Sequence, residues 1–340
     1  MLLSILPEQT VLISGGTGSL GEQLLAALVE QEQLELVEKI FPFSKPRQAG
    51  TIRVFSRDEK KQYDLKQKFP SVDFIIGNIS NFHSIRNAVR DMDIIIHAAA
   101  LKYVDVSEKQ PSQYIDVNVC GTQNLIAAVM LEENVSKCIG ISSDKACNPI
   151  NVYGMTKLLL EKLFLQAQDV KGTQIKTDFL IARYGNVIGT RGSVLPFWQK
   201  QRNSGKPLQV TNPEMTRFLF TLQEAVELID FALGGQGGIV VSKAMGAASL
   251  GGRAKAMSCS LDGTKEVGIE EIGSRGGEKL HEELFSEEEW SHVFINYEPF
   301  FVLNPKFKTE SNQLLTRWTS DSVPRISGTE LRDLIKDFLV

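Results

Sequence analysis

The 340-residue sequence has little of several features that mark specialised protein classes. Its four cysteines, Cys120, Cys138, Cys147 and Cys259, form no CxxC pair and have no histidine cluster beside them. We therefore expect reduced thiols, with neither a disulfide framework nor a metal site. No apolar run approaches the ~18 residues of a membrane-spanning helix. The net charge of −4 gives no excess of basic residues, so we expect no nucleic-acid partner.

The N-terminal residues MLLSILPEQT also lack the features of a secretory leader. They contain a short apolar run, but no basic segment precedes it and no cleavage-like site follows. We expect no signal peptide, and hence a cytoplasmic protein. The shares of hydrophobic residues (42%) and charged residues (23%) are ordinary for a soluble chain, which is long enough for one large domain or two smaller ones.

What the sequence does have is a regular alternation of short apolar runs and amphipathic stretches in its first half. The expected strands are Thr10–Ser14, Thr51–Phe55, Val72–Ile76, Asp93–His97, Lys137–Ile141 and Lys176–Ala182. The expected helices are Gly21–Glu30, Ser84–Val89, Tyr114–Leu131 and Tyr153–Ala167. Strands that alternate with helices predict an α/β fold, a Rossmann-type doubly wound parallel sheet with helices on both faces.

The alternation fades after Arg183, and the glycines of Gly234–Gly238 mark a turn. We expect residues 1–185 to form a dinucleotide-binding domain. Residues 186–340 would form mainly a smaller mixed α/β substrate-binding domain, with room for a segment that returns to the first sheet. Ser327–Leu339 resembles a closing helix with Ser327 or Thr329 as its N-cap. The connection Leu34–Gly50 is longer than usual, and no function follows from it.

The stretch VLISGGTGSLG places Gly15, Gly18 and Gly21 between the first strand and the first helix. Glycines permit a tight turn and a close approach of the backbone to a pyrophosphate, which the helix N-terminus attracts. The GxxGxxG spacing is typical of the short-chain dehydrogenase lineage, and the alternative is a plain tight turn. The expected cofactor contacts here are the three glycines together with Thr17, Ser19 and Leu20.

The end of the second strand bears on the choice between NADP and NAD. An NAD site usually has an acidic residue there, which accepts a hydrogen bond from the ribose 2′-hydroxyl. This strand ends with Ser56 and Arg57, and Lys60 and Lys61 follow one turn later. A cationic, hydroxyl-bearing end suits a 2′-phosphate, so we expect NADP. Asp58 keeps NAD open, because its carboxylate is able to bind a ribose.

Later strand ends add further candidates around the cofactor. Asn78 is placed to accept from the adenine amino group, and a turn asparagine is the alternative. His97 is equally consistent with a buried core histidine and with a contact residue. The other expected cofactor contacts are Ile79, Ala98, Ala99, Ala100, Lys102 and Asn118.

The stretch SSDKACNPINVYGMTK carries the candidate chemistry. Tyr153 and Lys157 are four residues apart in a helical segment, so they share one face. A neighbouring ammonium and a nicotinamide cation both favour the phenolate, as in the YxxxK pair of short-chain dehydrogenases. Asp144 and Lys145 are adjacent and face one substrate only if the strand has ended there. An ordinary surface ion pair is the alternative for these two.

The chain resembles a UDP-N-acetylglucosamine 4,6-dehydratase of the inverting type, in the extended short-chain dehydrogenase/reductase superfamily. The similarity covers nearly the whole chain. The motifs that carry it are SGGTGSLG, FSRDEKKQ, HAAALKYVDVSEKQP, NVCGTQNLI, SSDKACNPINVYGMTK, RYGNVIGTRGSVLPFW, MTRF and SRGGEKLHE.

The resemblance implies a redox-neutral elimination that uses bound NADP. Tyr153 would take the proton of the sugar 4-hydroxyl, Lys145 the carbon-5 proton, and Asp144 would protonate the departing 6-hydroxyl. Ser143, where the family commonly has threonine, would hydrogen-bond the 4-oxygen. Lys157, the nicotinamide and partial burial would oppose charge on Lys145, whereas Asp144 would favour it, so the pair titrates together. The lysine favours inversion at carbon 5, giving UDP-2-acetamido-2,6-dideoxy-β-L-arabino-hexos-4-ulose.

The same resemblance implies contacts to the substrate, although a surface salt bridge is the alternative for each residue alone. The expected contacts are Lys102, Asn186, Val194, Arg217, Arg275 and Glu278. The family pattern is departed from at Asn78 (usually aspartate), at Gly276 (usually proline) and in the Gly/Ala-rich stretch Ala244–Met257, which matches poorly. These departures bear on substrate detail more than on the reaction class.

Two other functions stay open at this stage. A nucleotide-sugar 4-epimerase or reductase shares Tyr153 and Lys157 but has no need of Asp144 and Lys145. A non-catalytic NADP-sensing protein would keep the glycine turn but would have no need of Tyr153 or Lys157. Relatives are commonly dimers to hexamers, so we expect a homo-oligomer. Whether the product would feed flagellin glycosylation, capsule or lipopolysaccharide stays open.

Overall fold

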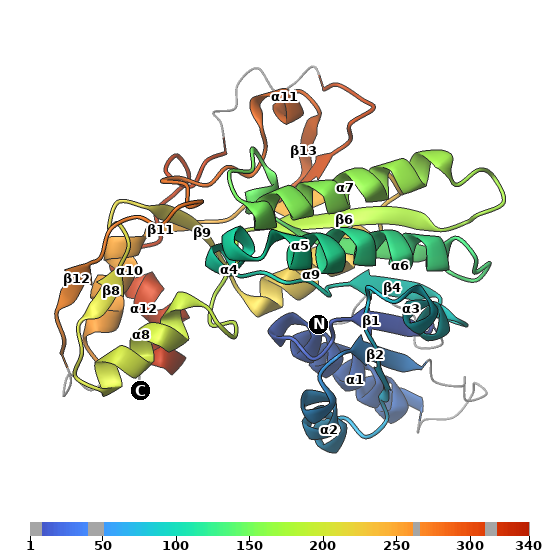
Figure 1. The fold of residues 1–340 in the computed structure, drawn as a ribbon, viewed down its shortest axis with the longest axis horizontal. Helices are drawn as coiled ribbons and strands as arrows, with labels where there is room; N and C mark the ends of the chain where they lie inside the picture. The colour runs from blue at the N-terminus through green and yellow to red at the C-terminus, as the bar shows by residue number, and fades with distance from the viewer. Residues whose placement is uncertain (1–8, 40–50, 261–265, 310–317, 340) are drawn as a thin grey trace.

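A computed structural model describes residues 9–39, 51–260, 266–309 and 318–339 (Figure 1). Residues 1–8, on which the signal-peptide prediction rests, lie outside the described residues. So do residues 40–50 of the long connection, whereas residues 34–39 belong to the first helix. Among the described residues, no helix has the length and apolar character needed to cross a membrane.

A nine-stranded sheet forms the centre of the structure, in the order β13-β14-β10-β6-β5-β4-β1-β2-β3. The strands from β3 to β10 pair in parallel, and β14 and β13 add antiparallel pairs at one edge. The bounds are β1 Val11–Ser14, β2 Ile52–Ser56, β3 Asp73–Ile76, β4 Ile94–His97, β5 Lys137–Ser143, β6 Asp178–Tyr184, β10 Val240–Lys243, β13 Val293–Tyr297 and β14 Phe300–Leu303.

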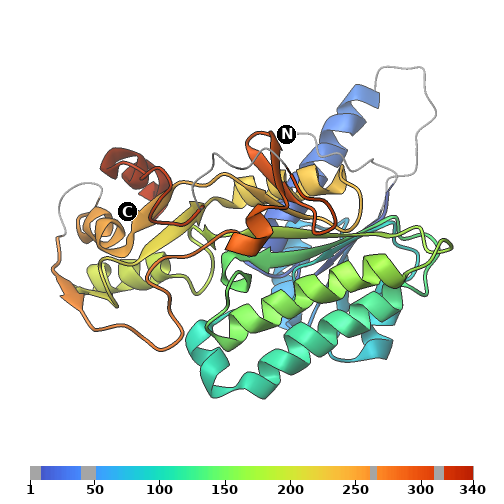
Figure 2. The ribbon, with the colours of Figure 1, turned by 90° about the horizontal axis from the view of Figure 1, so that it is seen from above.

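The prediction of a doubly wound, mostly parallel α/β sheet is confirmed. The central strands β1 and β4 are buried at every residue, as strands covered on both faces should be. The helices α3, α6 and α7 pack together on one face, while α1 and α9 pack together on the other (Figure 2). The bounds of these and the intervening helices are α1 Ser19–Lys39, α2 Glu59–Lys68, α3 Phe82–Val89, α4 Val104–Lys109, α6 Gly121–Val129, α7 Val152–Val170 and α9 Leu222–Leu233.

Three expected helices differ from the observed ones. The helix expected over Gly21–Glu30 is α1, which continues to Lys39. The segment expected as one helix over Tyr114–Leu131 consists of α5 (Pro111–Tyr114), a π-helical turn η1 (Ile115–Cys120) and α6. The expected closing helix is α12 (Gly328–Leu334) followed by a 3₁₀ turn η4 (Lys336–Phe338). Ser327 is its N-cap, in a capping box with Glu330, so Thr329 is not the cap.

The chain beyond residue 185 forms smaller elements beside the sheet (Figure 1). They comprise two small sheets, ordered β11-β9-β7 and β12-β8, and three further helices. Their bounds are β7 Asn186–Val187, α8 Val194–Asn203, β8 Leu208–Val210, β9 Thr216–Phe220, β11 Ala247–Ser249, α10 Leu250–Ser258, β12 Ile269–Glu271 and α11 Glu287–Trp290. Trp198 is fully buried in a second apolar cluster under these elements. Because β10, β13 and β14 belong to the large sheet, chain from beyond residue 185 returns to it; the division at that residue stays a prediction.

Candidate active site

The glycine turn between β1 and α1 is as tight as the motif requires. Gly15 has φ +72°, a conformation that favours glycine, and a Cβ there would lie 2.7 Å from the Ala99 backbone. A Cβ on Gly21 would lie 2.2 Å from the Gly16 carbonyl oxygen, so the first turn of α1 packs directly on the loop. Gly18 is exposed and meets little, which leaves its backbone open to an incoming group. This cradle fits a dinucleotide pyrophosphate.

At the end of β2, the polar side chains are already engaged within the protein. The buried Ser56 accepts a hydrogen bond from Gln62 (2.9 Å). Asp58 caps α2 by accepting from the Lys61 amide and forms an ion pair with the Lys61 ammonium at 2.6 Å. The hydrogen bond from Lys61 lowers the pKa of Asp58. Asp58 and Lys61 pair with each other, so Arg57 is the exposed cation next to the strand end, and the exposed Glu59 follows on α2.

Asn78 and Ile79 end β3 in a turn. The Asn78 side-chain oxygen accepts from the Ser80 amide (3.1 Å), the geometry of a turn asparagine. Ile79 is buried against Gly121, where a Cβ would lie 2.7 Å from it. The adenine contact of Asn78 stays a prediction.

His97, at the end of β4, is a core histidine rather than a residue of the cleft. Its ring nitrogens are hydrogen-bonded to Ser14 (2.8 Å) and Thr122 (3.0 Å), and its ring stacks on Phe164. Burial, and then the charge of Lys157, lower the pKa of His97 to about 3. The imidazole is therefore neutral and fully satisfied.

Asn118 clamps the chain that follows β4. From η1 it accepts from the Leu101 amide (2.8 Å), donates to the Leu101 carbonyl (2.9 Å) and donates to Thr156 on α7 (3.0 Å). These bonds hold the segment after Ala98–Ala100 against the glycine turn and α7. Asn118 thus positions the site, and a direct cofactor contact stays a prediction. Lys102, next along, is exposed; crowding by surrounding protein, and then Arg191, lower its pKa.

The chain turns sharply where β5 ends. Ser143 caps a 3₁₀ turn, η2 (Asp144–Ala146), so Asp144 and Lys145 project from a turn and not from a strand, as expected. The Ser143 hydroxyl donates to Asp144 (2.9 Å), and the Lys145 ammonium donates to the same oxygen (3.0 Å). Asp144 is completely buried, and its second carboxylate oxygen has no hydrogen-bond partner. A surface ion pair is excluded by this burial.

Helix α7 brings Tyr153 and Lys157 to the same place. Asn151 caps it by accepting from the Gly154 amide (2.7 Å). A Cβ on Gly154 would lie 2.2 Å from the Lys145 carbonyl oxygen, so the glycine lets the helix pack directly on η2. The buried Lys157 ammonium donates to the Ile141 carbonyl on β5 (2.7 Å). Acid, amines and phenol thus converge from one strand end and one helix start.

Comparisons with known proteins agree with this arrangement. The family model described as polysaccharide biosynthesis protein matches residues 11–304. The chain is 37% identical to a UDP-N-acetylglucosamine 4,6-dehydratase (inverting) of Campylobacter jejuni, over 88% of this chain and 84% of that one. It is 35% identical to a UDP-glucose 4-epimerase of Rickettsia bellii, over 96% of this chain and 95% of that one.

Solved structures show the same fold. Pen from Bacillus thuringiensis is 32% identical, with a TM-score of 0.86, over 97% of this chain and 98% of that one. A UDP-glucuronic acid 4-epimerase from Bacillus cereus, solved with UDP-glucuronic acid and NAD, shares the fold at 18% identity and a TM-score of 0.69, over 97% of this chain and 99% of that one.

The chain belongs to the polysaccharide biosynthesis protein family. In this polysaccharide biosynthesis protein, burial and nearby charges act together on the pKa values of the site. Burial alone would lower the pKa of Lys145, but the Asp144 and Glu282 carboxylates outweigh it and raise the pKa. Burial raises the pKa of Tyr153 to about 12, against the lowering effects of Lys145 and of a hydrogen bond with Ser143. Burial lowers the pKa of Lys157 to about 8.

As expected, burial opposes the charge on Lys145 and Asp144 favours it; the other large effects come from Glu282 and Arg217, and the opposition by Lys157 stays a prediction. The ammonium that acts on Tyr153 is Lys145.

Glu282 is a site residue that sequence reasoning missed. It is 2% exposed, lies 3.4 Å from the Lys145 ammonium and 3.7 Å from Arg217, and one of its oxygens has no hydrogen-bond partner. Glu282 is the last residue of the motif SRGGEKLHE, in which Arg275 and Glu278 were the predicted contacts. A glutamate far along the chain reaches Lys145 only through tertiary packing.

Of the expected substrate contacts, two lie at the catalytic turn and the others lie elsewhere. Asn186 accepts from Lys145 (3.3 Å), and Arg217 joins the Glu282 cluster, so both lie at the catalytic turn. Glu278 has a buried carboxylate oxygen without a partner. Val194 packs on the second apolar cluster. Arg275 is exposed, and the described part of the chain gives it no hydrogen bond or ion pair.

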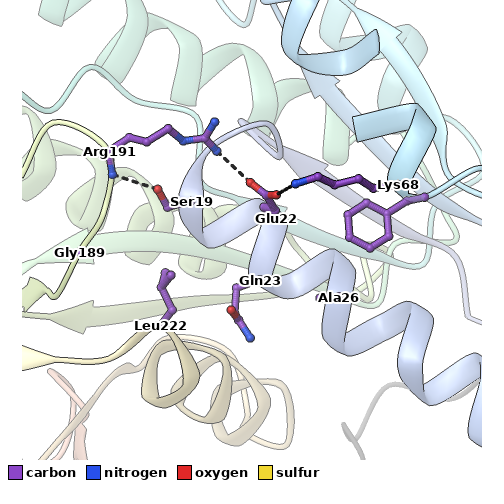
Figure 3. Close-up of a pocket in the computed structure, with 9 residues that line it drawn as sticks. Ser19, Glu22, Gln23, Ala26, Lys68, Gly189, Arg191 and Leu222 are labelled. Atoms are coloured by element: carbon purple, nitrogen blue, oxygen red, sulfur yellow. Dashed lines mark hydrogen bonds and ion pairs between the residues drawn. The ribbon is translucent and has the colours of Figure 1, made fainter. Parts of the chain in front are cut away.

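A pocket of about 570 Å³ flanks the glycine turn, on α1 and away from the catalytic turn (Figure 3). Arg191 closes one side of it, donating to the Thr17 carbonyl (2.9 Å) and, through its amide, to Ser19 (3.1 Å). Glu22 forms ion pairs with both Arg191 and Lys68 (Figure 3). The segment RYGNVIGTRG therefore contacts the glycine turn through Arg191.

Proposed function

We propose that this protein is a UDP-N-acetylglucosamine 4,6-dehydratase that uses bound NADP and inverts carbon 5. The observation that carries the proposal is the buried acid–base turn. Asp144 and Lys145 share a 3.0 Å contact in η2, beside the Tyr153–Lys157 face of α7. A hydride transfer at carbon 4 needs only Tyr153 and Lys157, whereas an elimination also needs a base at carbon 5 and an acid at the 6-hydroxyl.

The roles follow from the contacts. Bound NADP would accept the hydride from carbon 4 and return it to carbon 6. Tyr153 takes the 4-hydroxyl proton, helped by Lys145 and by Ser143, which also reaches the 4-oxygen. Lys145 removes the carbon-5 proton once it is neutral, and Asp144 protonates the leaving 6-hydroxyl. The Asp144 oxygen without a hydrogen-bond partner would carry the proton that the 6-hydroxyl receives.

The raised pKa of Lys145 sets a condition on this scheme. Two carboxylates hold the ammonium charged, so the positive nicotinamide ring and protonation of Asp144 must shift the balance before Lys145 acts as a base. Transfer of one proton from Lys145 to Asp144 gives the neutral amine that removes the carbon-5 proton and the carboxylic acid that protonates the leaving 6-hydroxyl. Lys145, protonated by that step, then delivers a proton to the opposite face of carbon 5 as the hydride reaches carbon 6.

Binding roles complete the proposal. The cofactor set is Gly15, Thr17, Gly18, Ser19, Leu20, Gly21, Ser56, Arg57, Asp58, Lys61, Asn78, Ile79, Ala98, Ala99, Ala100, Lys102, Asn118, Tyr153 and Lys157. The exposed Arg57 at the end of β2 supports NADP over NAD. The orphaned Glu278 oxygen supports its role as acceptor of the uridine ribose hydroxyls. Residues 1–185 would bind the cofactor and 186–340 mainly the substrate, in a cytoplasmic homo-oligomer.

A 4-epimerase is the second candidate, because relatives of that name cover 96% of the chain. Proton NMR of the product formed from UDP-N-acetylglucosamine in deuterated water, with NADP or NAD added, separates the two. We expect a 4-keto-6-deoxy sugar with deuterium and inverted configuration at carbon 5, formed faster with NADP.

Variants of the two pairs test the residues in that assay. Lys145→Ala should stop carbon-5 exchange and lower turnover about 10²- to 10⁴-fold, and Tyr153→Phe should stop hydride transfer. A product epimeric at carbon 4 that retains its 6-hydroxyl would sink the dehydratase. Exchange that persists in Lys145→Ala would remove the base assignment alone.

A further inference from the structure

Arg253 is a buried cation that no described side chain neutralises. It lies in α10, and 5% of its surface is exposed. In the described part of the chain it makes no hydrogen bond and no ion pair. None of its nitrogens is among the fully enclosed unpaired atoms, so the guanidinium borders accessible space. A buried guanidinium without a partner is costly, because burial removes its hydration and nothing replaces it.

The fold places this arginine beside Arg217. Strand β11 pairs with β9, so that Ala248 lies opposite Arg217, and α10 follows β11 at its cap Ser249. Burial, and then the charge of Arg217, lower the pKa of Arg253 to about 10, which leaves it charged at neutral pH.

The start of α10 is fixed to the segment that leads into β9. The Leu250 amide donates to the Met215 carbonyl (2.7 Å), and the Gly251 amide donates to the Pro213 carbonyl (2.9 Å). The two arginines are therefore held together by backbone contacts, not by a shared carboxylate.

The charges around these arginines do not balance. Among the described residues, Glu282 is the single carboxylate within ion-pair distance of Arg217, and it also faces Lys145 (3.4 Å) and Lys279 (4.0 Å). The neighbouring Glu283 accepts from Asn148 instead. Against the two carboxylates Asp144 and Glu282 stand four cations, so two positive charges are unmatched. The four cations are Lys145, Arg217, Lys279 and Arg253.

We propose that Arg253, together with Arg217, binds the diphosphate of the nucleotide-sugar substrate. A diphosphate diester carries two negative charges, which match the surplus, and guanidinium groups bind phosphate oxygens in pairs. This identity of the ligand rests on the proposed function. Arg253 lies in Ala244–Met257, the stretch where the family resemblance is weakest, so the contact is a feature of this chain.

The test measures binding of UDP, UMP and uridine to the full-length protein by calorimetry. In Arg253→Met the Kd for UDP should rise about 10- to 100-fold, the range for a lost charged hydrogen bond, while the Kd for uridine stays unchanged. Arg253→Lys should fall between the two. The control is Arg332→Met, since Arg332 donates to the Ala256 carbonyl of the same helix and faces no phosphate in the proposal; its Kd for UDP should stay that of the wild type.

Thermal unfolding without ligand gives a second readout. Because its charge is unmatched, Arg253→Met should keep or raise the Tm, which a structural arginine would not do. An unchanged Kd for UDP, or equal losses for UDP and uridine, would overturn the inference. Wild-type protein that fails to bind UDP would overturn it together with the UDP-sugar assignment. UDP binding that depends on Arg253 without dehydratase product would refute the proposed reaction and support this inference.

Discussion

Two charged clusters contact α7, and they differ in how completely their polar atoms are hydrogen-bonded. In one, Arg183 is fully buried and contacts two carboxylates: Glu161 (2.6 Å) and Glu289 (2.8 Å). Its guanidinium also donates to the Leu284 carbonyl, and Ser142 donates to Glu161. In the other, Lys145 and Glu282 belong to a group with surplus cations and unpartnered carboxylate oxygens.

The difference separates structure from function. The Arg183 cluster joins β6, α7 and α11 through partners that satisfy one another, as a buried network must if it is to stabilise. The Lys145 cluster leaves groups unsatisfied at a cost in folding free energy, and such groups concentrate where a substrate supplies the missing partners. Hydrogen-bond partners for every buried polar atom, and not burial, distinguish the Arg183 cluster from the Lys145 cluster.

Breaking the matched cluster should give the largest effect on stability. Arg183→Met leaves the buried Glu161 and the partly buried Glu289 without their cation, so the free energy of unfolding should fall by about 3–5 kcal/mol. Urea unfolding at pH 7 measures this. Lys243→Met is the control, because Lys243 pairs with Glu224 and Glu227 near the surface, where a pair is worth about 0–1 kcal/mol. Equal losses in both variants would contradict the comparison.

The pH dependence of that loss has a definite sign. Arg183 lowers the pKa of Glu289, although burial alone would raise it. A lowered folded pKa stabilises the protein above the unfolded value and loses this contribution as the pH falls through the folded one. The difference between wild type and Arg183→Met should therefore shrink as the pH falls below about 4.5, the unfolded pKa of glutamate.

Glu282→Gln tests the unmatched cluster through the pH profile of carbon-5 exchange. The groups that face Lys145 are Asp144 in its own turn, Glu282, Arg217 on β9 and Tyr153 on α7. Lys145 is a base only when neutral, so the rate rises with pH toward its raised pKa. Removing one carboxylate lowers that pKa and should move the rising limb about one pH unit lower.

The control for this shift is Glu283→Gln, the adjacent carboxylate that accepts from Asn148. Its profile should coincide with that of the wild type. A profile unmoved in Glu282→Gln would mean that Glu282 does not act on the catalytic lysine.

The same contrast explains what the sequence predicted and what it missed. Six strands came within two residues of the observed ones, because apolar runs and turn residues are local signals. The turn at η2 was expected because Asp144 and Lys145 are adjacent and Ala146–Pro149 follow them. The π-helical turn η1 was missed because Asn118 is held by tertiary bonds to Leu101 and Thr156. Glu282 was missed because its partner Lys145 lies more than 100 positions away in the sequence, and Arg253 because the pairing of β11 with β9 is what brings it near Arg217.

The smallest predicted effect concerns His97, a neutral buried group, and is a change in how stability depends on pH. Its folded pKa of about 3 lies below the unfolded value of 6.5. The unfolded chain binds a proton as the pH falls below 6.5 and the folded chain does not, so stability falls by at most about 1.4 kcal/mol per pH unit there. At pH 7 the contribution is close to zero, because both states are neutral.

Nitrogen NMR of the folded protein should therefore show a neutral His97 ring from pH 8 to pH 5. His97→Gln should remove its share of the stability slope between pH 6.5 and pH 5. A His97 signal that titrates near pH 6.5 would show that Ser14 and Thr122 do not hold the ring as a matched pair. In that case His97 would belong with Lys145, among the groups whose charge the site uses.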